Sequence, residues 1–370
     1  MRPAILKWLG GKRNHLPYLQ QLFRKANREV LVEPFVGSAV VFMNTEFEEY
    51  VLGDANRDLI ELYKYAMVTP EALISEMKPA FAEGFSKERY LELRSEFNRN
   101  NVFDIRRASL FVYLNRFGFN GLCRYNQSGA FNVPFGNYVV PERGPRLPEN
   151  AIMAFAEKAS RSKVKLMHAG FNDTIGSITE PERTLIYSDP PYVPLTKTAN
   201  FVGYTGNGFG SNEQLALASA HFEHYRRGGA VVLSNSDTAE TMRIFSHPDS
   251  RRYTLKVKRP IAAATDSRVP VCETMMVLGK EFPVLTIEQS AEAVREYVAN
   301  YARDRYVKEA CFVLTNDELG IIKLEGRALP DPRELPKKEN IGWAIDTDPG
   351  RHAGSFFVRY SHGNINIEYL

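Results

Sequence analysis

The stretch Thr184-Leu-Ile-Tyr-Ser-Asp-Pro-Pro-Tyr192 joins an apolar run to a proline-rich corner. The run at 184–188 predicts a buried strand that ends where a sheet meets its ligand. Pro190 and Pro191 each fix one φ angle and remove one N–H donor, so the chain is stiff after this strand. Asp189 precedes a proline and is therefore kept out of the helical region.

This corner offers a carboxylate, a carbonyl group and the aromatic face of Tyr192. Such groups suit a site that holds an exocyclic amine while the lone pair of the amine attacks an electrophilic methyl group. Asp-Pro-Pro is also common turn chemistry, so this stretch alone leaves a plain turn open.

Short strands alternate with helices in the first part of the chain. Residues 31–35 and 50–54 predict strands, and residues 39–47 and 57–66 predict the helices that follow them. This order indicates an α/β protein with a parallel sheet. Further strands are expected at 163–167, 230–234 and 273–278, with a helix at 213–226.

The ends of the first two strands predict a cofactor site. Gly37 lets the backbone approach a ligand, and the helix after it can hold a carboxylate. Asp54 is placed to accept hydrogen bonds from ribose hydroxyls. Because a phosphate-cradling glycine motif is missing, S-adenosylmethionine is favoured over NAD or ATP. A tight turn and a capping aspartate are the alternative. Residues 7–12 (KWLGGK) form either a surface turn or a cover over the methionine moiety, with Trp8 as a wall.

A candidate recognition region follows. Residues 86–97, with Ser86 as a capping residue, and 106–116 predict helices. Residues 117–150 lack periodicity, and their aromatic content argues against disorder. Residues 115–126 (NRFGFNGLCRYN) hold groups that stack on bases and bind guanine. A hairpin packed on its own domain is the alternative.

Charge supports a nucleic-acid partner in this part of the chain. The net charge is +3, but residues 86–148 carry ten basic and five acidic side chains. A solvated helical face is the alternative explanation. Three widely spaced cysteines indicate neither a disulfide framework nor a metal site. With no long apolar run and no signal peptide, we expect a cytoplasmic protein.

The end of the chain differs from the rest. Residues 283–370 carry 11 Lys and Arg against 14 Asp and Glu. A helix is expected from 287 to 305, and strands are expected at 310–314, 320–324 and 354–360. The pattern predicts a small α+β module at 284–370, with partner binding or dimerisation left open.

Six segments in this order resemble the Dam-type DNA adenine-N6 methyltransferases, which act on GATC. The resemblance covers about residues 4–280. The segments are residues 6–12 (LKWLGGK), 31–42 (LVEPFVGSAVVF), 52–60 (LGDANRDLI), 115–126 (NRFGFNGLCRYN), 131–138 (FNVPFGNY) and 188–201 (SDPPYVPLTKTANF).

The resemblance implies a Rossmann-like S-adenosylmethionine-dependent catalytic domain at 1–59 and 151–282. A helical and β-hairpin target-recognition domain would occupy residues 60–150, and the accessory module 284–370 has no counterpart in the typical enzyme. Duplex DNA is the implied substrate, no metal is needed, and a monomer or weak dimer is expected.

The resemblance also implies residue roles, in three groups. The catalytic corner would be Asp189, Pro190, Pro191 and Tyr192, which hold a flipped adenine. The cofactor would contact Trp8, Lys12, Glu33, Phe35, Gly37, Ser38, Asp54 and Asp189. DNA would be read by Lys7, Arg116, Phe119, Asn120, Leu122, Arg124, Pro134 and Tyr138.

The chain departs from the family pattern at several positions. Ala39 replaces a usual glycine, Phe119 a common tyrosine and Asn137 a common basic residue. Arg268 is the only cation of the loop at 262–270, which predicts weaker or less salt-sensitive DNA binding. There are three competing hypotheses. The chain could be a DNA-binding protein without turnover, it could methylate a DNA motif other than GATC, or it could methylate RNA or protein.

Overall fold

In the computed structural model the chain forms two compact units, Met1–Val231 and Val232–Leu370. Tyr138, Asn137 and the loop at 262–270 lie outside the described residues, as does the helix expected at 287–305. The described residues are 1–8, 10–82, 85–136, 144–193, 209–257 and 271–282, together with the strands at 309–315, 322–324, 355–361 and 364–369.

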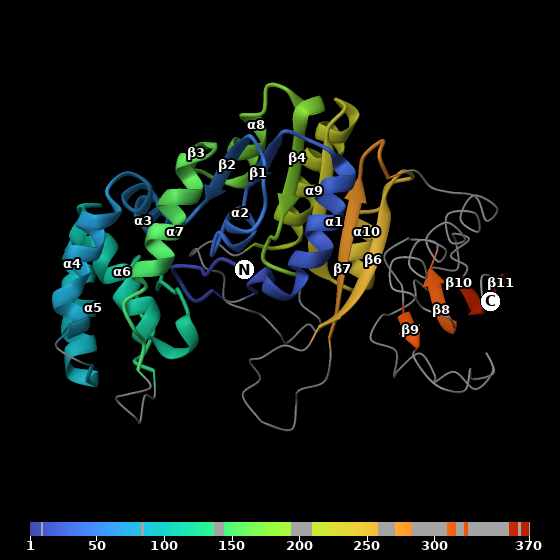
Figure 1. The fold of residues 1–370 in the computed structure, drawn as a ribbon. Coiled ribbons are helices and arrows are strands. Elements are labelled where there is room, and N and C mark those ends of the chain that lie inside the picture. Colours follow the sequence, from blue (N-terminus) through green and yellow to red (C-terminus); the bar gives the residue numbers. More distant parts are fainter. Residues whose placement is uncertain are drawn as a thin grey trace. The chain divides into compact units, whose positions relative to one another are not determined.

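A parallel sheet forms the core of the first unit (Figure 1). The described strand order within this unit is β3-β2-β1-β4, and every pairing is parallel. The order reverses between β1 and β4, and ligands of open α/β sheets bind outside the carboxyl ends of strands at such a point. The four strands are β1 (Val30–Glu33), β2 (Glu49–Asp54), β3 (Lys163–His168) and β4 (Thr184–Ser188).

The two strands at this reversal are continuous apolar runs. Every residue of β4 is buried, as are the last three residues of β1. Strands that are covered on both faces lose the alternation of apolar and polar residues, which explains these runs. The prediction of a parallel sheet with a buried strand at 184–188 is confirmed.

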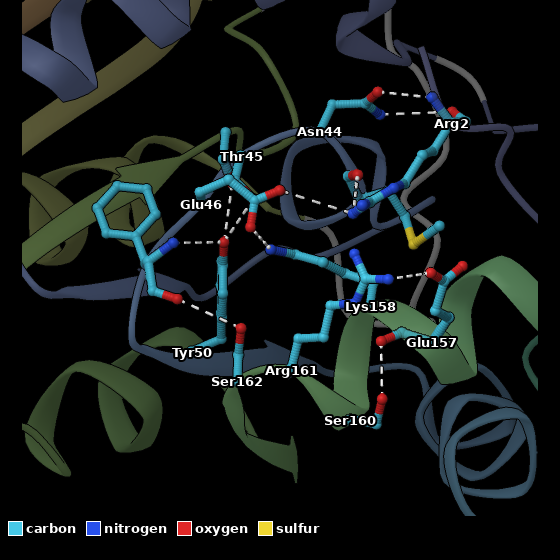
Figure 2. Close-up of polar contacts among 12 residues, drawn as sticks. Arg2, Asn44, Thr45, Glu46, Tyr50, Glu157, Lys158, Ser160, Arg161 and Ser162 are labelled. Atoms are coloured by element: carbon cyan, nitrogen blue, oxygen red, sulfur yellow. Dashed lines mark hydrogen bonds and ion pairs between the residues drawn. The ribbon is translucent and has the colours of Figure 1, made fainter.

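Helices cover this sheet, and one buried lysine links two of the covering segments. Lys158 of α7 is fully buried, and its Nζ lies 2.7 Å from Oε2 of Glu46 and 5.0 Å from the ring centre of Tyr50. Figure 2 shows the ion pair between Lys158 and Glu46, together with the hydrogen bond from Tyr50 Oη to the Thr45 carbonyl. The helices of this unit next to the sheet are α1 (Leu16–Ala26), α2 (Val40–Met43), α3 (Arg57–Val68), α7 (Glu149–Ser160), α8 (Phe171–Gly176) and α9 (Ser211–Arg226).

The helix expected at 39–47 is shorter than predicted. Ala39 has φ of 55°, in the left-handed region, so α2 begins only at the next residue. Asn44 then ends the helix, because its side chain bonds to Val40 O and to the backbone of Arg2. The apolar sequence alone carries no sign of this early end.

Three further helices form the part expected to recognise DNA. α6 (Ile105–Phe117) packs against α3, α4 (Pro70–Ala82) and α5 (Lys87–Arg99). The Ser86 side chain caps α5 by accepting a hydrogen bond from the Arg89 N–H, as predicted.

A short irregular segment follows α6. It contains the 3-10 helix η2 (Phe119–Gly121) and isolated antiparallel bridges between Tyr125 and Phe131 and between Gly118 and Phe135. Phe131 is buried while Phe119 is 45% exposed, so part of the segment packs inward and part faces solvent.

The second unit contains β6 (Arg251–Val257) and β7 (Val271–Leu278), which pair in antiparallel fashion. β5 (Ala230–Ser236) crosses the boundary between the units, and α10 (Ala239–Ile244) follows it. None of the helices in the described part of the chain has the length and apolar character needed to cross a membrane.

Residues near the C-terminus form an antiparallel sheet of strand order β11-β10-β8-β9. The three predicted strands are confirmed, and β11 is an addition that the sequence pattern did not reveal. The strands are β8 (Glu309–Thr315), β9 (Ile322–Leu324), β10 (Ser355–Ser361) and β11 (Asn364–Tyr369).

Candidate functional site

Gly37 joins the ends of β1 and β2 and lies against Trp8. Its N–H donates to Asp54 Oδ2 at 3.1 Å, and its carbonyl accepts from Tyr63 Oη at 2.6 Å. Its φ is 47°, and an added Cβ would lie 2.8 Å from Trp8 Nε1. A side chain is therefore excluded at this position for two reasons, the backbone conformation and the indole.

Asp54 binds two backbone amides at the end of β2. Its Oδ1 accepts from Asn56 N–H at 2.9 Å, and its Oδ2 accepts from Gly37. Burial raises the pKa of Asp54 to about 6, although the two N–H groups act against the rise. The carboxyl group is therefore held in a fixed orientation at the carboxyl edge of the sheet.

Glu33 ends β1 as a buried carboxyl group that is 2% exposed. Among the residues that the structure describes, none forms a hydrogen bond with its Oε1. Burial raises the pKa of Glu33 to about 8, the Phe42 N–H acts against the rise, and the charge of Asp189 adds to it. A buried carboxyl group with an unsatisfied oxygen favours a cationic ligand.

Lys12 connects the N-terminal segment to the corner after β4. Its Nζ lies 2.8 Å from Asp189 Oδ1, donates to the Gly10 carbonyl at 2.8 Å, and stands 4.8 Å from the centre of the Tyr192 ring. Lys12 is buried, whereas Asp189 and Tyr192 are half-buried. Two segments that are far apart in sequence thus meet at the expected carboxylate.

Two buried side chains of α9 contact the same corner, and sequence reasoning did not find them. Gln214 Nε2 donates to the Pro191 carbonyl at 2.7 Å, and His221 Nε2 is hydrogen-bonded to Ser188 Oγ at 2.9 Å. Burial and the neighbouring His224 lower the pKa of His221 to about 3, so this imidazole is neutral at physiological pH.

Phe35 belongs to an aromatic group with two further rings. Its ring stacks on Phe171 at 5.8 Å between centres and meets Phe209 edge-on at 5.6 Å. All three side chains are half-buried. Phe35 was predicted as a cofactor contact, whereas Phe171 and Phe209 carried no signal because each is a single aromatic outside the six segments. Ser38, also predicted, is buried in the turn before α2.

Ala39 is the departure from the family pattern with the clearest local effect. The left-handed backbone, φ 55° and ψ 21°, is one that glycine adopts readily. An L side chain costs about 1–2 kcal/mol there. The side chain is also fully buried, which returns part of that cost through apolar burial.

Asn115 connects Lys7 to residues 116–136, the recognition segment. Its Oδ1 accepts from the Lys7 N–H at 2.9 Å, and its Nδ2 donates to the carbonyls of Lys7 and Gly121 at 2.8 and 2.9 Å. Lys7 Nζ also donates to the Arg116 carbonyl at 3.3 Å. Lys7, a predicted base reader, is thus brought to the segment that contains the other predicted readers in the described part of the chain.

The remaining predicted readers differ in their surroundings. Arg124 is exposed, and its guanidinium donates to Asn132 Oδ1 and O at 2.7 and 3.3 Å. Arg116 donates to the carbonyls of Ala4 and Ile5, so its head group holds the N-terminal segment. Phe119, Asn120 and Pro134 are exposed, and Leu122 is half-buried.

Within the described ranges, no three His, Cys, Asp or Glu residues are grouped so that they could hold an ion.

Comparison with known proteins identifies relatives over most of the chain. The D12 class N6 adenine-specific DNA methyltransferase family matches residues 8–261. A DNA adenine methylase of Vibrio cholerae serotype O1 is 45% identical over 244 residues, 65% of this chain and 84% of that protein. The DNA adenine methylase of Escherichia coli (strain K12) is 38% identical over 274 residues, 74% of this chain and 94% of that protein.

These matches confirm the resemblance that the six segments indicated, and they cover the residues that build the corner after β4. The family match spans Lys12, Gly37, Asp54 and Asp189, whose contacts join β1, β2, β4 and the N-terminal segment. The chain belongs to the D12 class N6 adenine-specific DNA methyltransferase family.

Proposed function

We propose that this enzyme transfers a methyl group from S-adenosylmethionine to N6 of a flipped adenine in duplex DNA, within GATC. The observation that carries the proposal is the Lys12–Asp189–Tyr192 cluster at the carboxyl end of β4. It brings together a carboxylate for an amine and an aromatic face for a base.

The charges around β1 and β2 fit the cofactor. Glu33 offers a buried carboxyl oxygen without a partner among the described residues, which suits the positively charged methionine part. Asp54 stands at the neighbouring strand end, where ribose hydroxyls would donate to it. Trp8 against Gly37 would form one wall, with Lys12, Phe35 and Ser38 completing the set. When bound, the cofactor supplies a methyl group on a positively charged sulfur, which is already a strong electrophile.

The residues of the corner would then position the amine. Asp189 accepts a hydrogen bond from the N6 amine, and so does the carbonyl of Pro190, which directs the lone pair toward the methyl group. Lys12, 2.8 Å from Asp189 Oδ1, favours the ionised carboxylate that this role requires. Tyr192 stacks on the adenine, so catalysis rests on positioning and desolvation.

The exposed groups of the recognition segment support base reading. Arg124 has the fork geometry for guanine O6 and N7, and Leu122 and Pro134 suit a thymine methyl group. Phe119 and Asn120 are exposed and would fill the stack that the adenine leaves. Lys7 would reach a base from the N-terminal segment, and Tyr138 completes the proposed set. Arg116, whose head group binds the carbonyls of Ala4 and Ile5, would support that segment instead of reading a base.

We propose three domains. Residues 1–59 and 151–282 form the catalytic domain, residues 60–150 read the target, and residues 284–370 form an accessory module. The acidic balance of the module argues against direct DNA contact.

The test is base-resolved mapping of N6-methyladenine in plasmid DNA that has been incubated with enzyme and S-adenosylmethionine. Methylation confined to GATC is expected, with none for Asp189→Ala. Methylation at a different motif would refute the GATC assignment and leave the chemistry. A plasmid without N6-methyladenine would refute the proposed substrate, and labelled cofactor with RNA or protein extract would then identify the acceptor.

A further inference from the structure

Helix α9 lies beside β4 (Figure 1), and hydrogen bonds join the two in antiparallel order along the strand and the corner after it. His224 Nε2 bonds to the Thr184 carbonyl at 3.2 Å, near the start of the strand. His221 bonds to Ser188 at its end, and Gln214 reaches the Pro191 carbonyl beyond it. One helix therefore contacts the residue before Asp189 and a residue after it.

Pro190 and Pro191 have no N–H, so neither donates a hydrogen bond within the corner. The Lys12–Asp189 ion pair holds the carboxylate of the corner. A donor to a backbone carbonyl of the corner would also fix the peptide planes next to Asp189 and Tyr192.

Gln214 supplies such a donor. Its side chain is 2% exposed, so the amide is held in one place and competes with no bulk water. It lies in the first turn of α9, where Gly210 N–H donates to Glu213 Oε2 at 2.8 Å. Just before that turn, Phe209 packs edge-on against Phe35 of the expected cofactor segment. The start of α9 is thus fixed on one side by the cofactor segment and on the other by the catalytic corner.

We propose that Gln214 is a positioning residue for methyl transfer, which sets the orientation of the corner 189–192 through its hydrogen bond to the Pro191 carbonyl. This inference rests on the proposed function. Gln214 would not touch the adenine, because its amide is directed at the backbone of Pro191. Its role is to place Asp189 and Tyr192 so that the amine is held in line with the methyl group.

The test variants remove the hydrogen-bond donor of Gln214 and keep the volume of its side chain. Gln214→Glu and Gln214→Met both remove the amide N–H, and Gln20→Met is the matched control. Gln20 Nε2 donates to the Asn44 carbonyl at 2.6 Å, so the control loses the same kind of bond on α1. All proteins are full length, and the readout is single-turnover methylation of a GATC duplex with enzyme in excess, alongside the Kd for DNA and for S-adenosylmethionine.

A positioning role predicts that the single-turnover rate constant falls about tenfold in both Gln214 variants. The Kd values should change less than about twofold, and the control should keep the wild-type rate constant. The reaction amplitude reports the folded fraction separately, so a variant that is only less stable shows a smaller amplitude at an unchanged rate. That outcome, or equal losses in Gln214→Met and Gln20→Met, would overturn the inference while the proposed function stands. A wild-type protein that leaves the duplex unmethylated would overturn both.

Discussion

Replacing Glu33 with glutamine should remove a pH-dependent loss of stability. The ordinary pKa of a glutamate is 4.5, and burial raises that of Glu33 to about 8. Between these values the unfolded chain has an ionised carboxylate, whereas the folded protein keeps the proton. Folding then requires proton uptake, so the free energy of unfolding falls by about 1.4 kcal/mol for each pH unit. At pH 7 the accumulated loss from this group is about 3 kcal/mol.

The direction of this pH dependence follows from the number of protons that the folded and unfolded states bind. A raised carboxyl pKa gives stability that is fully present below about pH 4.5 and is lost as the pH rises toward about 8. Asp54, with its pKa raised to about 6, adds a loss of the same sign over a narrower range. Glutamine at position 33 keeps the shape of the side chain and has no titratable proton. The variant therefore loses only the part of the pH dependence that Glu33 contributes.

Urea unfolding of the cofactor-free protein at pH 5, 6, 7 and 8 measures this effect. The stability difference between Glu33→Gln and wild type should shift in favour of the variant by about 3 kcal/mol or more from pH 5 to pH 8. Glu49→Gln is the control, because the hydrogen bond from Lys163 lowers the pKa of that half-buried carboxyl group, so any pH dependence has the opposite sign. A difference that stays constant across this range would refute the buried, proton-holding state of Glu33.

The other predictions concern binding and catalysis. The affinity for S-adenosylmethionine should rise between pH 6 and pH 8, because the cationic cofactor binds the ionised form of Glu33 more tightly. Calorimetry in buffers of different ionisation enthalpy should therefore detect proton release on binding. A pH-independent affinity would exclude Glu33 from the cofactor site. Asp189→Ala should abolish methylation and leave the Kd for duplex DNA within about twofold, since the carboxylate acts on the flipped base; an equal loss of binding would make Asp189 structural. Arg124→Ala should relax discrimination at one base pair by about 1–3 kcal/mol in methylation of substituted duplexes, and unchanged specificity would remove it from the readers.

Local signals identified the four parallel strands of the first unit but missed β6 and β11, and they were insufficient for several helices. The strand at 184–188 is recovered residue for residue, because a continuous apolar run stops at two prolines. The helix expected at 39–47 fails at both ends, since Ala39 takes a left-handed conformation and Asn44 bonds to the distant Arg2. Such contacts between remote segments leave no periodic trace in a sequence.

The same distinction applies to the candidate site. Asp54 and Asp189 stand directly at strand ends, and Gly37 lies in the turn four residues after β1, so a parallel sheet brings them to one edge. Gln214 and Asn115 were missed because each acts through backbone carbonyls of segments far away in the chain. A buried amide that binds backbone looks, in a sequence, like any other polar residue on a helix.

The N-terminal segment links the two halves of the proposed reaction. Lys7 is bound through its backbone to Asn115, and five residues later Lys12 contacts Asp189. Gly121 belongs to the same arrangement, because an added Cβ there would lie 2.3 Å from the Lys7 side chain. Lys7 and Lys12, five positions apart, therefore connect the recognition segment to the proposed catalytic carboxylate. We expect a shift of the recognition segment against the sheet to alter both proposed activities, the reading of the target and its methylation.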